Sequence, residues 1–381
     1  MTNEPIRSVE PNRRRSLRNW QPGDQPWELK GSAMGRPVLR DLASNDYLGL
    51  ARHPAVIKAA AIALDADGVG AGGSRLVTGT RPRHTRLEAE LGEWLGRDQV
   101  LLFPSGFQAN LAAVAALAER HTTVLADRLI HYSLLVGVRA SGARLQRFAH
   151  NDLEDLERRL QQLDRNNSAP VVISESLFSM EGTSPDLKAM AALCARYGAQ
   201  LLVDEAHGLG VVGPGGRGLC WGVDDPVHLI SGTFGKAFGS GGAFLAGDAA
   251  MGERLLQTSG AFRYTTALAP PLVAGAQAAL DLIKANPHWG QALIQRSEAW
   301  RTALALAGWQ RPRGIGPVLP LLLNSDQGAL DYQQQLEQHG LLSIAIRPPT
   351  VPEGTSRLRL VLRKDLPDDT LELLLGALAA G

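Results

Sequence analysis

Short apolar segments alternate with helical patterns through the middle of this 381-residue chain, and this alternation constrains the fold more than any other feature. Leucines at helical spacing separate several of the segments, as in Leu153, Leu156 and Leu160. Such alternation predicts an α/β fold whose large domain has a mainly parallel, seven-stranded sheet covered by helices. The strand-like segments are Val100–Phe103, Val124–Ala126, Arg144–Phe148, Val171–Ser174, Leu201–Asp204, Val227–Ser231 and Ala243–Ala246, of which the last follows closely enough to run antiparallel.

The pattern changes on both sides of this region. Residues 1–44 are rich in Arg, Pro and Gly and predict an extended arm with a short strand near Val38–Leu42. After Pro271, long helical patterns lead to a mixture of strands and helices. We therefore expect an arm over 1–44, a large domain over 45–270 and a smaller α+β domain over 271–381.

Composition excludes several classes of partner. The formal charge of +1 gives no reason to expect nucleic acid or an anionic membrane. Only Cys194 and Cys220 occur, which is too few for a disulfide framework or a zinc site, so a cytoplasmic protein without a metal is expected. No apolar run reaches membrane-spanning length, and the basic segment Arg13–Arg18 has no apolar region behind it.

One lysine stands out in the segment Ser231–Gly242. Lys236 lies in a Gly-rich turn between two apolar runs, which places it on a loop between two buried strands. A nucleotide-binding P-loop is excluded, because Ile230 and Ala237 occupy the positions of its first Gly and its Ser or Thr. A lysine near small hydroxyl groups suits a phosphorylated cofactor bound as a Schiff base, although the local pattern fits a solvated surface lysine about equally well.

Polar residues gather where the predicted strands end. Ligands on open parallel sheets bind at the carboxyl ends of the strands. The segment Phe103–Phe107 leads from a strand into a helix, so its N–H groups predict an anion site. Glu175–Ser179 ends another strand, and Asp204 to His207 ends a third. These segments predict one shared binding site at that edge of the sheet.

Two motifs have alternative interpretations. The sequence Asp204-Glu-Ala-His207 also occurs at the magnesium site of helicases, but those proteins need a P-loop and basic tandem domains. A metal site at Asp204 and His207 lacks a third credible ligand, while a purely structural Asp204 remains open. The Gly68–Gly73 segment matches the dinucleotide motif G-x-G-x-x-G, yet it follows a helical pattern rather than a strand, so we expect a flexible loop.

The chain resembles the α-oxoamine synthases, which are pyridoxal-phosphate enzymes with the aspartate-aminotransferase fold, known as fold type I. The resemblance covers about residues 13 to 380 and implies a homodimer whose active site is shared between subunits. The motifs that carry it are Ser44-Asn-Asp-Tyr-Leu-Gly49, Phe103-Pro-Ser-Gly-Phe107, Asp127-Arg-Leu-Ile-His131, Ser176-Leu-Phe-Ser-Met-Glu-Gly182, Asp204-Glu-Ala-His207 and Thr233-Phe-Gly-Lys236.

The resemblance also implies a role for each matching residue around pyridoxal phosphate. Lys236 would form the Schiff base and Asp204 would pair with the pyridinium nitrogen. His131 would stack on the ring and also face the substrate, and His207 would bind the phenolic oxygen. The phosphate and phenolic oxygens would be held by Gly106, Phe107, Ser179 and Thr233, with Thr265 of the neighbouring subunit.

For the substrates, the resemblance implies that Asn45 and Arg359 hold the amino-acid carboxylate, and that Arg18 and Thr350 contact the acyl substrate. The segments Gly72–Gly79 and Ala345–Pro352 favour family members that join L-alanine to a pimeloyl thioester of coenzyme A or acyl carrier protein, with loss of carbon dioxide. Sister synthases that use glycine or serine share much of this pattern. An aminotransferase and a helicase-like ATPase follow as more distant alternatives.

Overall fold

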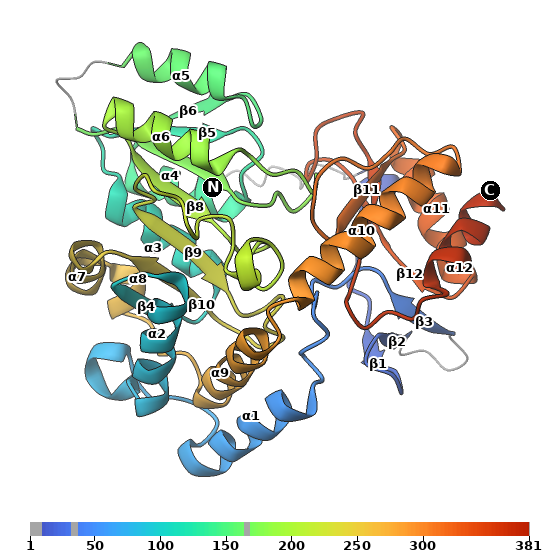
Figure 1. The fold of residues 1–381 in the computed structure, drawn as a ribbon, viewed down its shortest axis with the longest axis horizontal. Helices are drawn as coiled ribbons and strands as arrows, with labels where there is room; N and C mark the ends of the chain where they lie inside the picture. The colour runs from blue at the N-terminus through green and yellow to red at the C-terminus, as the bar shows by residue number, and fades with distance from the viewer. Residues whose placement is uncertain (1–9, 32–36, 164–167, 381) are drawn as a thin grey trace, which may run out of the picture. The chain divides into compact units, whose positions relative to one another are not determined.

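The computed structural model describes residues 10–31, 37–163 and 168–380 (Figure 1). Contacts group the chain into two units. Unit 1 comprises the described parts of Met1–Asn45, Met180–Gly182 and Gln295–Gly381, and unit 2 comprises those of Asp46–Ser179 and Thr183–Ile294. The arm thus groups with the C-terminal residues, while α9 (Pro270–Ala285) groups with unit 2. The division into domains at residues 44 and 270 stays a prediction.

Unit 2 is built on the predicted seven-stranded sheet, and its strands follow the apolar segments of the sequence. The strands β9, β8, β7, β5 and β6 pair in parallel, whereas β10 runs antiparallel to both of its neighbours. The mainly parallel α/β architecture is therefore confirmed. In spatial order the strands are β4 (Gln99–Phe103), β10 (Ala243–Gly247), β9 (Leu229–Thr233), β8 (Gln200–Asp204), β7 (Val171–Glu175), β5 (Thr123–Asp127) and β6 (Arg144–Phe148).

The helices of unit 2 mostly follow strands along the chain, and α3 (Gly106–Leu117) packs against the sheet. Its buried face consists largely of alanines, whose small side chains let the helix approach the strands closely. The remaining helices are α1 (Pro54–Asp67), α2 (Pro82–Leu95), α4 (Tyr132–Ser141), α5 (Leu153–Gln161), α6 (Leu187–Tyr197), α7 (Ala249–Thr258) and α8 (Gly260–Arg263), with short turns η2 (Arg75–Gly79) and η3 (Pro214–Gly216).

Unit 1 holds two small sheets, and one of them joins the arm to the C-terminal part of the chain. Its helices are η1 (Pro11–Arg13), α11 (Asp326–Gln338) and α12 (Thr370–Ala379), and α10 (Trp289–Leu306) begins in unit 2 and continues into unit 1. The first sheet contains β1 (Trp20–Pro22), β2 (Glu28–Gly31), β3 (Val38–Asp41) and β12 (Leu341–Leu342), and the second contains β11 (Val318–Leu322), β14 (Arg357–Val361) and β13 (Ile344–Ile346).

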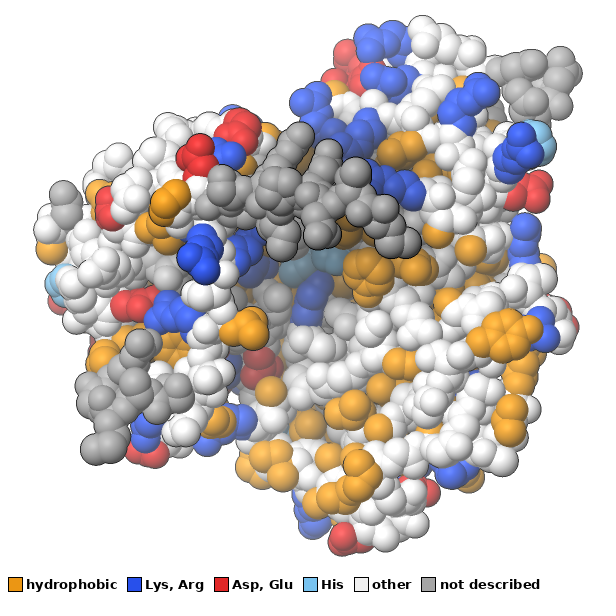
Figure 2. Space-filling model, turned by 180° about the vertical axis from the view of Figure 1, so that it is seen from behind, with side chains coloured by type: hydrophobic (Ala, Val, Ile, Leu, Met, Phe, Trp, Pro, Cys, Tyr) orange, Lys and Arg blue, Asp and Glu red, His pale blue; other side chains and the backbone are white. Residues whose placement is uncertain are grey.

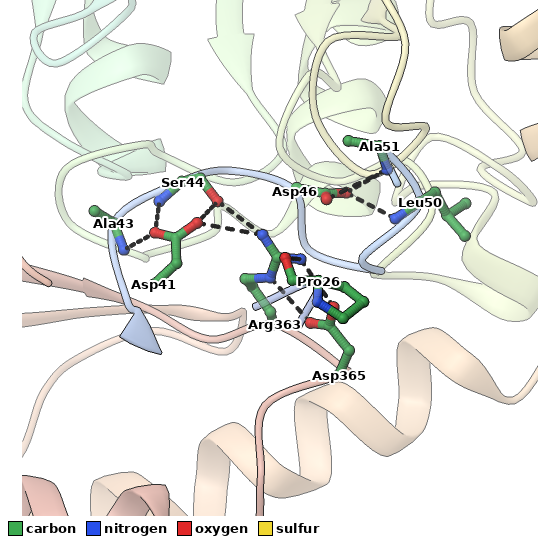
Figure 3. Close-up of polar contacts among 9 residues, drawn as sticks. All are labelled: Pro26, Asp41, Ala43, Ser44, Asp46, Leu50, Ala51, Arg363 and Asp365. Carbon is green, nitrogen blue, oxygen red and sulfur yellow. Dashed lines mark hydrogen bonds and ion pairs between the residues drawn. The ribbon is translucent and has the colours of Figure 1, made fainter. Parts of the chain in front are cut away.

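A buried ion pair fixes the end of the arm within unit 1. Arg363 and Asp41 are each less than 5% exposed, and their side chains meet at 3.2 Å (Figure 3). Arg363 also pairs with Asp365 at 2.8 Å and donates to the carbonyl of Pro26. Because a buried guanidinium needs several acceptors, this cluster holds the segment after β3 in one position. In unit 2, Asp46 accepts hydrogen bonds from the N–H groups of Leu50 and Ala51 (Figure 3).

The described ranges contain neither a membrane-spanning helix nor a cluster of metal-ligating side chains. None of the helices there is both long and apolar enough to cross a bilayer. Nor do those ranges bring three or more His, Cys, Asp or Glu side chains together as a metal site would require. Cys194 and Cys220 are both buried free thiols.

Candidate active site

Lys236 lies on the connection between β9 and β10, at the carboxyl end of the parallel strands. The base of this connection is closed by the N–H of Phe234, which donates to the carbonyl of Gly242 at 2.9 Å. Within it, the N–H of Gly239 donates to the carbonyl of Lys236 at 2.9 Å. Gly239 has φ +60°, and a Cβ there would lie 2.2 Å from the nitrogen of Ala51. The backbone under Lys236 is therefore tightly held, and a glycine is required at 239.

The N-terminus of α3 faces the end of β9. Ser105 caps the helix by accepting a hydrogen bond from the N–H of Gln108. A Cβ built on Gly106 would lie 3.8 Å from the hydroxyl oxygen of Thr233, so these predicted phosphate-binding residues are brought together. Phe107 stays 45% exposed. N–H groups at a helix N-terminus beside a small hydroxyl residue form a suitable site for a phosphate.

Asp204 is the last residue of β8 and is 6% exposed. Its Oδ1 accepts a hydrogen bond from the N–H of Ala206 at 2.8 Å, and its Oδ2 accepts one from the side-chain amide of Asn110 at 2.8 Å. Two donors from different elements therefore orient this buried carboxylate. Such a carboxylate suits a partner that carries a positive charge, such as a protonated ring nitrogen.

His131 caps the N-terminus of α4 through its Nδ1, which accepts a hydrogen bond from the N–H of Ser133. A backbone N–H can only donate, so the neutral imidazole carries its proton on Nε2. The residue keeps exposed surface, yet burial of the ring lowers the pKa of His131 below its usual 6.5; Asp204 counteracts this shift and Lys236 adds to it. The N–H of His131 donates to the carboxylate of Glu175, which fixes the start of the helix.

His207 lies one turn after Asp204 and is 6% exposed. Its Nδ1 is hydrogen-bonded to the hydroxyl of Tyr47, which is completely buried. Tyr47 belongs to the Ser44–Gly49 motif, so a residue more than a hundred positions away in the sequence orients this imidazole. The contact uses Nδ1 and thereby sets the direction in which Nε2 points.

In unit 1, the two residues expected to hold a carboxylate contact each other. Arg359 on β14 is 6% exposed and donates to Asn45 Oδ1 at 2.9 Å. Two positions earlier on the same strand, Arg357 pairs with Glu181 at 3.2 Å. The structure therefore brings Asn45 and Arg359 together, and their role in binding substrate stays a prediction.

The expected acyl-substrate residues are arranged differently. Arg18 makes two hydrogen bonds to the carboxylate of Glu337, and its guanidinium lies 4.6 Å from the centre of the Trp20 ring. Arg15 is instead the arginine whose Nη2 contacts Thr350 Oγ1, at 2.9 Å. Of the two arginines, only Arg15 contacts the predicted partner in the described part of the chain.

Ser179 and Thr265 complete the set of predicted residues in unit 2. Ser179 is half-buried in the connection between β7 and α6. Thr265 lies in a surface hollow that is also lined by Leu76, Val77 and Tyr264, which are 53%, 77% and 81% exposed. Figure 2 shows hydrophobic side chains exposed among polar ones on one face of the molecule.

Three contributing residues were given no role from the sequence, namely Tyr47, Asn110 and Ser133, and Glu175 was predicted only as the start of a strand-end segment. For Asn110 the sequence did contain a signal. It is a polar residue within the alanine-rich helix α3, four positions after Gly106, and positions i and i+4 share one face of a helix. Tyr47 contributes through a contact with a distant segment, whereas Ser133 contacts both the nearby His131 and Asn110 on another helix.

Comparison with known families decides the assignment. A family model described as aminotransferase class I and II matches residues 38–378. The chain belongs to this family. Solved structures agree: serine palmitoyltransferase from Sphingomonas wittichii is 31% identical with a TM-score of 0.88, covering 94% of this chain and 90% of that one. A structure described as SPT with a PLP internal aldimine has a TM-score of 0.90 at 28% identity, covering 96% and 92%.

Several curated relatives within the family carry the name 8-amino-7-oxononanoate synthase. The one from Chromohalobacter salexigens is 41% identical, over 93% of this chain and 92% of that protein. A putative synthase of this name from Bordetella bronchiseptica is 42% identical, over 92% and 89%. The structure of the synthase from Francisella tularensis has a TM-score of 0.78 at 25% identity, covering 90% of this chain and 97% of that one.

These findings confirm the resemblance to the α-oxoamine synthases, fold type I and pyridoxal phosphate as the cofactor. The chain is accordingly a pyridoxal-phosphate enzyme, and its relatives confirm the expected acyltransferase class. The residues of unit 2 fit this cofactor, because the helix N-terminus at Gly106, the carboxylate of Asp204 and the amine of Lys236 all occur at the same edge of the sheet.

Proposed function

We propose that this enzyme condenses L-alanine with a pimeloyl thioester, carried by coenzyme A or acyl carrier protein, to give 8-amino-7-oxononanoate, carbon dioxide and the free thiol. This reaction belongs to biotin synthesis, and we place the enzyme in the cytoplasm. The observation that carries the proposal is the name shared by curated relatives that are 41% to 42% identical over more than nine tenths of the chain.

A sister synthase is the second candidate. The solved structures of serine palmitoyltransferase, at 28% to 31% identity, favour it. Enzymes of this kind use glycine or serine with another acyl-CoA, as 2-amino-3-ketobutyrate CoA ligase, 5-aminolevulinate synthase and serine palmitoyltransferase do. The two candidates share the cofactor chemistry and differ in the two substrates.

The residues of unit 2 have distinct tasks in the proposed reaction. Pyridoxal phosphate, when bound, supplies an electron sink for the carbanion formed at the amino-acid Cα. Asp204 keeps the ring nitrogen protonated, and His131 covers the ring with a neutral imidazole. The amine of Lys236 takes the proton from Cα. The remaining polar groups hold the oxygens of the cofactor: the N–H groups of Gly106 and Phe107, the side chains of Ser179 and Thr233, and His207.

The residues of unit 1 bind the substrates. Arg359, oriented by Asn45, provides a planar fork for the carboxylate of alanine. For the acyl substrate we assign Arg15 and Thr350 rather than Arg18, because Glu337 already compensates the charge of Arg18. The far carboxylate of a pimeloyl group requires such a cationic anchor.

The enzyme works as a homodimer in this proposal, and Thr265 completes the phosphate site of the neighbouring subunit. The exposed apolar side chains beside Thr265, at Leu76, Val77 and Tyr264, support burial by a second copy. Mixing inactive Lys236→Ala protein with a Thr265→Val variant tests this arrangement. Hybrid dimers contain one site with both substitutions and one with neither, so activity returns in part. No recovery despite subunit exchange would place both residues in one chain's site.

The substrates are tested by measuring carbon dioxide and free thiol with alanine and each of four thioesters: acetyl, succinyl, palmitoyl and pimeloyl. We expect clear preference for pimeloyl, whereas preference for another chain would favour a sister synthase. Glycine serves poorly as a discriminator, because one methyl group changes selectivity by only about 1–3 kcal/mol. The covalent role of Lys236 is tested by borohydride reduction, which should label Lys236 in the wild type and no residue in Lys236→Ala.

A further inference from the structure

Asn110 connects Asp204 to Ser133, the neighbour of His131, and both Asp204 and His131 are proposed to contact the cofactor ring. Its Nδ2 donates to Asp204 Oδ2 at 2.8 Å and to Ser133 Oγ at 2.9 Å. The amide orientation is fixed by chemistry, since a carboxylate oxygen accepts and only the NH2 group can donate to it. Both amide protons of Asn110 are therefore donated to these two neighbours. The residue is 3% exposed.

Ser133, the second residue that Asn110 contacts, is in turn hydrogen-bonded to His131. Ser133 is completely buried, and its hydroxyl oxygen lies 2.9 Å from the Asn110 amide and 2.7 Å from His131 Nδ1. Because that oxygen accepts from Asn110, its own proton is available to Nδ1. The N–H of Ser133 donates to the same nitrogen at 3.3 Å. In this series of hydrogen bonds, Asn110 donates to Ser133, and Ser133 donates to His131 Nδ1. The imidazole proton is therefore kept on Nε2.

A role in packing alone does not account for this asparagine. The side-chain oxygen of Asn110 has no hydrogen-bond partner among the described residues. A buried amide with an unpaired oxygen is less favourable than an apolar side chain of similar shape. Its buried neighbours on α3, such as Ala109, Ala113 and Val114, pack against the core without any polar side-chain atom. The polar side chain at this position is thus explained by its two donors.

We propose that Asn110 is a positioning residue that holds the Asp204 carboxylate and the Nε2-protonated His131 imidazole in one fixed relationship, so that both would meet the cofactor ring in the proposed orientation. The inference rests on the proposed roles of Asp204 and His131. The charged groups that face His131 are Asp204, Lys236 and the carboxylate of Glu175, which binds its backbone N–H. Asn110 contacts one of these charged groups, Asp204, and is joined to His131 through the hydroxyl of Ser133.

The test compares four variants as holoenzymes. Asn110→Leu removes both donors, Asn110→Asp replaces the amide with a carboxyl group of the same shape, and Ser133→Ala breaks only the connection to His131. Gln108→Leu is the matched control, because this amide on the same helix donates to the carbonyl of Ala261 instead. Each variant is measured for the visible absorption of bound pyridoxal phosphate against pH, cofactor dissociation, the kcat and KM for alanine, and thermal stability.

We expect Asn110→Leu to bind the cofactor more weakly and to lower kcat by about 10- to 100-fold, as removal of orienting groups does at metal sites, with little change in KM. Asn110→Asp places a second carboxyl group beside Asp204, so one proton is shared and the visible band titrates at a different pH. Ser133→Ala should reproduce part of the loss, and Gln108→Leu should behave as the wild type. A wild-type spectrum, kcat and cofactor affinity in Asn110→Leu would overturn the inference.

Two further outcomes keep the test decisive. If Asn110→Leu does not fold, Asn110→Asp and Ser133→Ala decide, and an unchanged pH titration of the visible band in both contradicts the inference. Asp204→Asn separates this inference from the proposed function. Unchanged turnover in Asp204→Asn refutes the proposed role of Asp204 itself, whereas a strong loss there with a wild-type Asn110→Leu refutes only the positioning role of Asn110.

Discussion

Arg359 donates a hydrogen bond of 2.9 Å to the side-chain oxygen of Asn45, joining a C-terminal strand to the end of the arm across 314 positions of sequence. The arginine is 6% exposed, so its guanidinium is held away from bulk water. A fixed guanidinium holds its donors in one plane, which matches the geometry of a carboxylate.

Arg359→Lys should impair the use of alanine, because an ammonium group cannot reproduce the planar fork. A hydrogen bond to a charged group contributes about 1.5–3 kcal/mol, so kcat/KM should fall by roughly 10-fold or more, mainly through KM. Steady-state kinetics over a series of alanine concentrations measure this. The matched control is Arg357→Lys on the same strand, which contacts Glu181. Equal KM values in Arg359→Lys and the wild type would contradict the assignment.

Tyr47→Phe should disturb His207 without changing the shape of the core. The substitution removes the hydroxyl that bonds to His207 Nδ1, and a buried polar group left without its partner costs about 1–3 kcal/mol. We expect weaker cofactor binding, seen in the visible spectrum during dialysis, and a lower kcat. Tyr332→Phe is a control in unit 1, where the ring packs against Trp309. The role of Tyr47 is refuted if its variant retains cofactor as firmly as the control.

Glu205 predicts a specific dependence of stability on pH. Burial raises the pKa of Glu205 above its usual 4.5, so the folded protein retains a proton that the unfolded chain releases. The resulting stabilisation is complete below pH 4.5 and is lost as the pH rises through the folded-state pKa. Glu205→Gln stays neutral throughout. Its stability relative to the wild type should therefore increase as the pH rises above 4.5 in denaturant titrations. A constant difference would show that Glu205 ionises normally.

Gly208→Ala should destabilise the protein through direct crowding. A Cβ at this position would lie 2.3 Å from Glu205 Oε2 and 2.5 Å from Ser176 Oγ, in a fully buried region. Overpacking of this kind costs about 1–3 kcal/mol. Gly70→Ala is the control, because nothing lies within 4 Å of its Cβ position. Thermal unfolding should show a loss for Gly208→Ala alone, and similar values for both variants would exclude crowding.

The strands of the large sheet could be predicted because each one is a short apolar segment that can be recognised from its own residues. Segments such as Val171–Glu175 are buried on both faces and are therefore apolar along their whole length. The spatial order of the strands could not be predicted, because it depends on how the crossovers pack. Nor did hydrophobic pattern reveal that β3 of the arm pairs with β12, since a two-residue strand leaves almost no periodic signal.

The residues of the candidate site could be predicted where a chemically reactive side chain stands at or just after the end of an apolar strand. Asp204 ends one apolar strand and Lys236 comes three residues after another, so parallel pairing of the two strands brings both residues to the same edge. Contacts that cross between elements could not be predicted: Tyr47 reaches His207, and Arg15 rather than Arg18 reaches Thr350. Such contacts depend on side-chain direction after folding, which neither spacing nor composition determines.

The hairpin of β9 and β10 has a consequence for the rate at which Lys236 can act. Its connecting backbone is closed by hydrogen bonds at Phe234 and Gly239, and both flanking strands are buried within the sheet. Loop rearrangements take nanoseconds to microseconds or longer, whereas rotation of a side chain takes picoseconds to nanoseconds. The amine of Lys236 can therefore approach and leave its target by bond rotation in its four-carbon stem. Each catalytic cycle then does not have to wait for a slower movement of the backbone.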